Sequence, residues 1–297
     1  MHMISDTVET WRHRDILTNG IRMHYVIQGE ENRGPLVVLM HGFPEYWYSW
    51  RYQIPWLAEM GYTVVAPDLR GYNESDKPRT GYDTSTLSRD IEGLIKGLGY
   101  ERAVIVGHDW GGALAWVFAM RYPQMTERLV VLNAPHPWAL QRDLKTPHQL
   151  RKSWYVFFFQ LPWLPEALLG YNHAEAIGRS IYASAVQKSA FPPDVLMRYR
   201  AAMSKPGALT AALDYYRATF RRGSFGFAPA RPQTRINAPT LLIWGEQDVA
   251  LGINLTHGLE QWVPNIQIRR IPDSGHWVQQ EKPGDVNDFL QAFLQPV

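Results

Sequence analysis

One aspartate lies where the chain passes from a strand-like segment into a helix-like one. Residues 103–106 are apolar and mostly β-branched, which is typical of a short buried strand in a parallel sheet. Residues 107–111 read Gly-His-Asp-Trp-Gly, and residues 113–120 then have helical composition. The flanking glycines let a strand and a helix approach each other without a clashing Cβ atom. This pattern predicts a nucleophile elbow, with the Asp109 side chain at the apex of a sharp turn.

An aspartate at this apex predicts attack on a saturated carbon. A serine that attacks an sp³ carbon forms an ether, whereas a carboxylate forms an ester that a general base can hydrolyse. Asp109 therefore indicates alkyl transfer to the protein followed by hydrolysis, as in epoxide opening or dehalogenation. The alternative interpretation is that Asp109 only supports the turn.

Other strand-like and helix-like segments alternate along the chain and must position this turn. The expected strands lie at residues 7–15, 21–27, 36–40, 62–67, 128–132, 240–244 and 266–271. The expected helices lie at residues 46–60, with a break near Pro55, and at 84–98, 253–262 and 283–294. Strands that alternate with helices imply right-handed crossovers and a mostly parallel sheet covered on both faces.

The alternation stops in the middle of the chain. Residues 136–231 contain helix-like and aromatic segments separated by prolines, without a convincing buried strand. We therefore predict an α/β core made of residues 1–135 and 232–297, interrupted by a helical cap over residues 136–231.

Composition excludes several classes of protein. With 45% hydrophobic and 20% charged residues among 297, the chain is globular, and a net charge of +2 gives no case for nucleic acid or an anionic membrane. The absence of cysteine excludes disulfides, a thiolate zinc site and a cysteine nucleophile. There is no His-Glu-x-x-His and no Gly-x-Gly-x-x-Gly, so we expect no metal and no dinucleotide cofactor.

The N-terminal residues lack the pattern of a signal peptide, and no apolar run reaches the length of a membrane span. We expect a cytoplasmic enzyme with a small-molecule substrate. The sequence leaves open whether the protein is a monomer or a homodimer.

Four motifs in a fixed order carry a resemblance to a known family. Residues 41–45 read His-Gly-Phe-Pro-Glu, residues 68–78 contain Asp-Leu-Arg-Gly-Tyr and Ser-Asp-Lys-Pro, and residues 273–277 read Asp-Ser-Gly-His-Trp. Together with the elbow at residues 107–112, they resemble the α/β-hydrolase fold over nearly the whole chain, and within it the epoxide hydrolases. One such match is weak, but four in the right order are a strong signal.

The resemblance implies two partners for Asp109. His276 matches the position of the general base, and Asp248 matches the acid that orients the imidazole and stabilises its charged form. Some dehalogenases carry this acid after the preceding core strand, where this chain has Asn133. Glu246 and Asp273 are the competing carboxylates.

The resemblance also implies an oxyanion hole and a pocket. The backbone N–H groups of Phe43 and Trp110 are expected to hold the oxyanion that forms when water attacks the ester. The side chains expected to wall the pocket are His41, Pro44, Trp154 and Phe158. The aromatic side chains of Phe43, Trp110, Trp154 and Phe158 favour an apolar or aryl substrate.

Tyrosines in the cap distinguish an epoxide from a halide. When an epoxide opens, its oxygen becomes a basic alkoxide that needs a proton donor. A phenol with a pKa of about 10 can donate this proton at neutral pH. Residues 153–160 resemble the family segment that carries the first such tyrosine, which would be Tyr155. Residues 214–217 resemble the second segment and place the tyrosine at Tyr216, with Tyr215 as the alternative.

Three differences separate this chain from dehalogenases of the same fold. Fluoroacetate dehalogenases carry Arg where this chain has Trp110, and His-Trp where it has Tyr155 and Val156; haloalkane dehalogenases commonly carry Asn where it has Phe43. We therefore predict a cofactor-independent epoxide hydrolase that forms a vicinal diol. The alternatives are a haloalkane or haloacetate dehalogenase and, more remotely, a non-catalytic receptor with a hydrolase fold.

Overall fold

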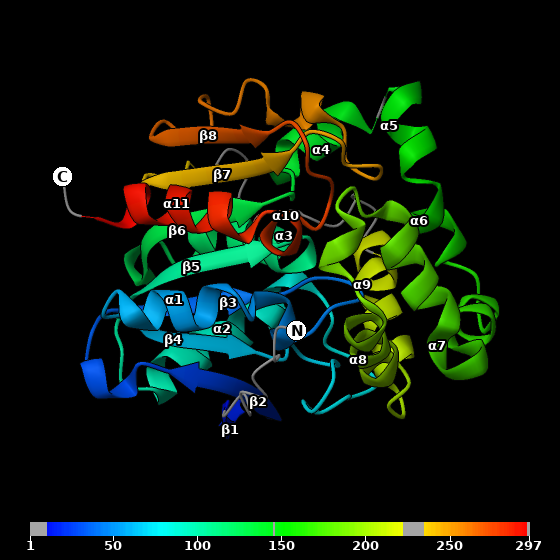
Figure 1. The fold of residues 1–297 in the computed structure, drawn as a ribbon, viewed down its shortest axis with the longest axis horizontal. Helices are drawn as coiled ribbons and strands as arrows, with labels where there is room; N and C mark the ends of the chain where they lie inside the picture. The colour runs from blue at the N-terminus through cyan, green and yellow to red at the C-terminus, as the bar shows by residue number, and fades with distance from the viewer. Residues whose placement is uncertain (1–10, 145, 222–234, 296–297) are drawn as a thin grey trace, which may run out of the picture.

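The computed structural model describes residues 11–144, 146–221 and 235–295, and its centre is one eight-stranded sheet (Figure 1). The strands are β1 (Arg12–Thr18), β2 (Ile21–Gln28), β3 (Leu36–Met40), β4 (Thr63–Pro67), β5 (Ala103–His108), β6 (Thr126–Leu132), β7 (Thr240–Gly245) and β8 (Ile266–Ile271). Their order is β1-β2-β4-β3-β5-β6-β7-β8. The pairs β1–β2 and β2–β4 are antiparallel, and the other pairs are parallel.

The central strands are apolar along their whole length because helices cover both faces of the sheet. Every residue of β3, β4, β5 and β7 is buried. Figure 1 shows α1 (Gln53–Glu59) and α11 (Pro283–Leu294) in front of the sheet, with α2 (Thr84–Gly97) and α3 (Trp110–Arg121) behind it. Helix α3, which follows the elbow, is buried on almost every residue. The predicted α/β architecture is confirmed.

Two predicted helices differ from the structure. The segment predicted as a helix over 253–262 contains only the 3₁₀ turn η5 (Ile253–Thr256), because Gly258 has a φ of 68°, which a right-handed helix cannot include. The segment 46–60 is divided into the 3₁₀ turn η2 (Trp47–Trp50) and α1, with Pro55 in the first turn of α1. Residues 7–10 of the first expected strand lie outside the described residues.

Between β6 and β7 the chain leaves the sheet and forms a helical insertion. Its elements are α4 (Pro137–Asp143), α5 (Pro147–Lys152), α6 (Trp154–Phe158), α7 (Leu164–Ser184), η4 (Lys188–Ala190), α8 (Pro193–Met203) and α9 (Ala208–Arg221). Figure 1 shows α6, α7, α8 and α9 beyond the carboxyl ends of the parallel strands. Within the described part of this interval there is no strand, as the sequence pattern predicts.

The remaining short elements lie at the ends of the strands. They are η1 (Glu30–Asn32), η3 (Pro123–Met125) and α10 (Val278–Glu281). Helix α10 follows directly after residues 273–277 and leads into α11, so it anchors the last motif of the sequence to the sheet.

The turn between β5 and α3 is a strained elbow. Asp109 has a φ of 49° and a ψ of −119°, a conformation that side chains rarely adopt. Glycine is required on both sides of the turn. A Cβ atom on Gly107 would lie 2.2 Å from the carbonyl oxygen of Gly111, and one on Gly111 would lie 2.2 Å from the carbonyl oxygen of Met40 in the neighbouring strand β3. The elbow therefore exists because small residues allow the backbones to come together around the Asp109 side chain.

This close approach predicts that Gly111→Ala destabilises the fold. The added methyl group would collide with backbone rather than with a movable side chain, so we expect the free energy of unfolding to fall by about 3 kcal/mol. Urea denaturation followed by circular dichroism measures this change. The matched control is Gly284→Ala in α11, where an added Cβ meets nothing within 4 Å and should cost no stability. Equal stability of the two variants would contradict this account of the elbow.

Candidate functional site

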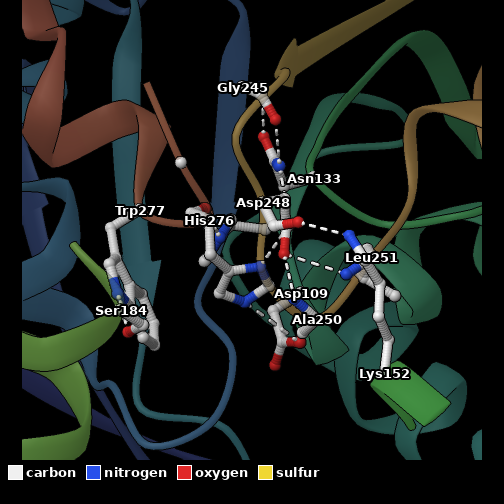
Figure 2. A network of polar contacts seen from close by, with 12 residues as sticks. Asp109, Asn133, Lys152, Ser184, Gly245, Asp248, Ala250, Leu251, His276 and Trp277 are labelled. Atoms are coloured by element: carbon white, nitrogen blue, oxygen red, sulfur yellow. Dashed lines mark hydrogen bonds and ion pairs between the residues drawn. The ribbon is translucent and has the colours of Figure 1, made fainter. Parts of the chain in front are cut away.

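Asp109 is placed at the carboxyl end of β5 and is held from two sides. The backbone N–H of Phe43 donates to Oδ1 of Asp109 at 2.8 Å. Nε2 of His276 lies 3.5 Å from Oδ2 on the other side of the carboxylate (Figure 2). Gly42 makes room for this arrangement, because a Cβ atom there would lie 2.4 Å from the Asp109 side chain. The two oxygens of Asp109 are therefore in different environments.

His276 and Asp248 reach Asp109 from the ends of β8 and β7. Nδ1 of His276 donates to Oδ2 of Asp248 at 2.7 Å, which leaves Nε2 facing Asp109. The Asp248 side chain is completely buried. The structure brings the three predicted residues together in the order carboxylate, imidazole, carboxylate.

The buried carboxylate of Asp248 is satisfied by donors besides His276. Its Oδ1 accepts from the backbone N–H groups of Ala250 at 2.7 Å and Leu251 at 2.9 Å. Its Oδ2 also accepts from the side-chain amide of Asn133 at 2.8 Å, as Figure 2 shows. Asn133 is itself anchored, since its Oδ1 accepts from the N–H of Gly245 at 2.9 Å. A buried carboxylate needs such donors to remain charged.

Electrostatics make His276 a cation in this arrangement. Burial favours the neutral imidazole, but the charge of Asp248 and the hydrogen bond and charge of Asp109 outweigh burial and raise the pKa of His276 well above 6.5. Burial alone would raise the pKa of each carboxyl, yet His276 lowers the pKa of both Asp109 and Asp248 below 3.8. The resting site is thus an imidazolium between two carboxylates.

The competing carboxylates lie elsewhere. Glu246 is exposed to solvent. Asp273 is also exposed and forms an ion pair with Lys282. Within the described residues, neither makes a hydrogen bond to an imidazole, so the geometry favours Asp248.

Two tyrosines of the helical insertion face the same cavity as Asp109. Tyr155 lies on α6 and Tyr216 on α9, and their rings meet edge to face with centroids 6.0 Å apart. Burial, and after it the negative charge of Asp109, raises the pKa of both phenols well above 10. Both therefore keep their protons at neutral pH.

Tyr215 points away from this cavity. Its hydroxyl donates to the backbone carbonyl of Arg70 at 2.7 Å, and its ring is fully buried against Tyr72 and Tyr82. One step along α9 thus turns the side chain from the cavity to the core, which favours Tyr216 as the second donor.

The cavity has a volume of about 90 Å³ and a mostly apolar wall. The wall is formed by Asp109, Trp110, Ala113, Ala134, Pro135, Leu140, Leu144, Ser153, Tyr155, Val156, Phe157, Tyr216, Thr219 and Leu251. Trp110 both follows Asp109 in the chain and forms part of the wall. Asp109 is the only residue of this wall that carries a charge at neutral pH.

Four residues predicted for the pocket wall are not part of it. Trp154 is 64% exposed, because the short helix α6 turns Tyr155 inward and Trp154 outward. Phe158 packs against Phe159 with ring centroids 5.8 Å apart. His41 is fully buried and accepts a hydrogen bond from the N–H of Leu69, and Pro44 is buried beside it.

A buried pair that the sequence did not reveal supports the His276 loop. Nδ1 of His108 lies 2.8 Å from Oε2 of Glu45, and Nε2 of His108 lies 2.8 Å from the backbone carbonyl oxygen of His276. Both side chains are excluded from solvent. The only signal in the sequence was that both residues belong to motifs, and their contact depends on bringing β3, β5 and β8 together.

The described residues contain no group of three or more histidine, cysteine, aspartate or glutamate side chains that could hold a metal ion. No helix in the described part of the chain is long and apolar enough to cross a membrane.

Comparisons with known proteins agree with this geometry. The family description "alpha/beta hydrolase fold" matches residues 35–283. Epoxide hydrolase 3 of Xenopus tropicalis is 43% identical over 93% of this chain and 76% of its own length, and the AB hydrolase superfamily protein YfhM of Bacillus subtilis is 41% identical over 94% and 96%. The crystal structure of an epoxide hydrolase of Bacillus megaterium with an inhibitor superimposes with a TM-score of 0.87 at 32% identity, covering 95% of this chain and 99% of the other.

The ion pairs of His276 predict how the site responds to pH. Because the pKa of His276 is raised on folding, its charge stabilises the fold below pH 6.5, and this contribution is lost as the pH rises through the folded value. Because the pKa values of Asp109 and Asp248 are lowered on folding, their negative charges stabilise the fold above pH 3.8. This contribution is lost as the pH falls through the folded pKa values of the two carboxyl groups. NMR titration of the histidine Cε1–H signals should therefore find His276 still charged above pH 6.5.

Asp109→Asn should lower the pKa of His276, since it removes one of the two carboxylates that stabilise the imidazolium. Asp273→Asn is the matched control, because Asp273 pairs with Lys282 at the surface. An unchanged pKa of His276 in Asp109→Asn would contradict the assigned ion pair.

Proposed function

The chain belongs to the epoxide hydrolases of the α/β-hydrolase fold family, and on this premise we propose that it converts an apolar or aryl epoxide and water into a vicinal diol through a covalent ester on Asp109. The observation that carries the proposal is the cavity in which Asp109 faces two protonated phenols, Tyr155 and Tyr216. A carboxylate on one side and two phenols on the other match a substrate that is attacked at carbon while its oxygen takes a proton.

In the first step Oδ2 of Asp109 attacks a ring carbon of the epoxide. Oδ1 accepts the N–H of Phe43 at 2.8 Å, whereas Oδ2 has only the longer 3.5 Å contact with Nε2 of His276, so we assign the new C–O bond to Oδ2. The ring C–O bond breaks as this bond forms, and the departing alkoxide takes a proton from Tyr155 or Tyr216. The raised pKa of both phenols keeps the proton in place until the alkoxide develops.

Formation of the ester changes His276 from a cation to a base. Esterification removes the negative charge of Asp109, so the imidazolium loses one of its two stabilising carboxylates and releases its proton more readily. The released proton returns to the phenolate that protonated the alkoxide, so the phenol is restored. Asp248 remains hydrogen-bonded to Nδ1 and keeps Nε2 directed at the ester.

In the second step His276 takes a proton from a water molecule, whose oxygen attacks the ester carbon of Asp109. The negative charge then develops on Oδ1, which already accepts from the N–H of Phe43, and the N–H of Trp110 is the second proposed donor. The bond from the ester carbon to Oδ2 breaks, and the diol leaves with a proton from His276. The carboxylic acid left on Asp109 then gives its proton to His276, which restores the carboxylate and the imidazolium.

The second candidate is a dehalogenase on the same scaffold. A halide leaves without needing a proton, whereas the two buried phenols opposite Asp109 are suited to an alkoxide. A non-catalytic receptor would have no need for the assembled Asp109, His276 and Asp248. Incubation with styrene oxide and with a haloalkane panel tests the choice, and halide release without diol formation would overturn the proposal.

A trapped intermediate gives the sharpest test of the covalent step. In His276→Phe the ester should form but not hydrolyse, because no base activates water. Mass spectrometry of the intact protein should show an adduct equal to the whole mass of the epoxide, since ring opening expels no leaving group. Peptide mapping should place it on Asp109, and Asp109→Asn is the control without an adduct. An adduct that has lost the elements of a hydrogen halide would instead identify a dehalogenase.

The proton donors are tested by removing the two hydroxyl groups. Tyr155→Phe combined with Tyr216→Phe should slow ring opening by about 10³-fold or more, because the alkoxide would leave without a proton. The rate of ester formation after rapid mixing with excess epoxide measures this step. Tyr215→Phe is the matched control and should keep the rate, since its hydroxyl donates to Arg70 outside the cavity. A normal rate in the double variant would exclude both residues as donors.

A further inference from the structure

One helix of the insertion contacts the loop that carries Asp248, the buried carboxylate that accepts from His276. This acid loop consists of residues 248–252, between β7 and η5. Inside it, the carboxylate of Asp248 accepts from the N–H groups of Ala250 and Leu251. From outside, side chains of α5 (Pro147–Lys152) bind three of its backbone groups. The acid loop is thus held both by the catalytic carboxylate and by the insertion.

Gln149 provides the first link between α5 and the acid loop. Its side-chain amide donates to the carbonyl oxygen of Ala250 at 2.9 Å, and its Oε1 accepts from the N–H of Gly252 at 3.1 Å. The same amide nitrogen also donates to the hydroxyl of Ser153 at 3.1 Å. Gln149 is only 2% exposed, although it lies on a short helix of the insertion. Both donor hydrogens of its amide are therefore used, one on the acid loop and one on Ser153 at the end of α5.

Lys152 provides the second link, one turn further along α5. Its Nζ donates to the backbone carbonyl oxygen of Asp248 at 2.8 Å. Figure 2 shows the Lys152 side chain reaching the acid loop from the side opposite His276. This hydrogen bond links the backbone of Asp248 directly to the insertion.

The same helix also positions the first proton donor. Helix α5 ends at Lys152, and α6 (Trp154–Phe158) begins two residues later with Tyr155 in its first turn. Ser153 lies at the junction of the two helices. Its hydroxyl accepts a hydrogen bond from the side-chain amide of Gln149, and its N–H donates to the backbone carbonyl oxygen of Gln149. Tyr155 is three residues from Lys152, so a displacement of α5 would move Tyr155 and the acid loop together.

We propose that Gln149 and Lys152 are positioning residues that couple the proton donor Tyr155 to the acid Asp248. This inference rests on the proposed function for the roles of Tyr155 and Asp248, but its geometry does not. Neither residue touches the substrate cavity, since neither is part of its wall. They act by fixing α5 to the acid loop. The phenol of Tyr155, needed for ring opening, and the carboxylate of Asp248, needed for hydrolysis, therefore keep their relative positions.

The coupling gives a kinetic signature that loss of a single catalytic group does not. Removing the hydroxyl of Tyr155 affects ester formation, and removing the carboxylate of Asp248 affects mainly ester hydrolysis. Releasing α5 from the acid loop should slow both steps, because it displaces both groups. A small displacement of reacting groups commonly costs about tenfold or more in rate, so we expect a loss of that size in each step.

A proton NMR measurement tests the acid loop without using any reaction. The proton that Nδ1 of His276 donates to Asp248 should give a signal far downfield in the wild-type protein. In Gln149→Ala and in Lys152→Met this signal should shift or broaden, because the backbone of Asp248 loses its external support. Arg151→Ala is the matched control, since Arg151 lies on the exposed face of the same helix. An unchanged signal in both test variants would overturn the proposal.

Rapid mixing with excess styrene oxide then tests the coupling to Tyr155. Quenching of tryptophan fluorescence, to which Trp110 beside Asp109 contributes, reports formation and decay of the ester. Both rate constants should fall about tenfold or more in Gln149→Ala and in Lys152→Met. Lys152→Arg should restore both rate constants, because arginine retains a donor for the carbonyl oxygen of Asp248. If the substitutions only reduced the folded fraction, the amplitude would fall while both rate constants stayed normal, and the proposal would be wrong.

The two experiments separate failure of this inference from failure of the proposed function. A wild-type protein that opens no epoxide would refute the proposed function, while the NMR signal would still decide whether α5 positions the acid loop. A fall confined to the hydrolysis step would show that Gln149 supports only Asp248, and the coupling to Tyr155 would be overturned.

Discussion

The site depends on one imidazolium held between two buried carboxylates. Burial disfavours the charge on each of the three groups. The imidazolium remains charged because two carboxylates lie beside it, and each carboxylate remains charged because the imidazolium and its hydrogen-bond donors lie beside it. Further hydrogen bonds stabilise this arrangement. The N–H of Phe43 donates to Asp109, and the amide of Asn133 and two backbone N–H groups donate to Asp248. The charge balance also explains how esterification of Asp109 could change His276 from a cation to a base.

The parallel sheet brings these groups together from distant parts of the chain. Strands β5, β6, β7 and β8 are neighbours in space as well as in sequence, so the loops at their carboxyl ends meet at one edge. Asp109, Asn133, Asp248 and His276 each lie in a different one of these four loops. The loop after β3, which supplies the N–H of Phe43, joins them because β3 lies beside β5. Strand order thus decides which loops can share a site.

The helical insertion completes the site with chemistry that the sheet does not offer. It supplies the two phenols and much of the wall, so the cavity combines one anion with two phenol hydroxyl groups in mostly apolar surroundings. It also binds the acid loop through Gln149 and Lys152. In the proposed mechanism the insertion therefore supplies part of the site and is more than a cover over it.

The sequence by itself determined the parts of the site whose geometry is local. A strained turn between a buried strand and a helix requires glycines beside Asp109, and such short-range requirements are visible as motifs around residues 41–45, 107–112 and 273–277. Only the tertiary structure decided which side of α9 faces the cavity, which side of the five-residue helix α6 turns outward, and that Gln149 meets the acid loop about a hundred residues later. The five-residue helix α6 carries no periodicity from which its buried side can be read. In the longer helix α9, Tyr215 and Tyr216 are both buried, so hydrophobicity alone does not distinguish the one that faces the cavity.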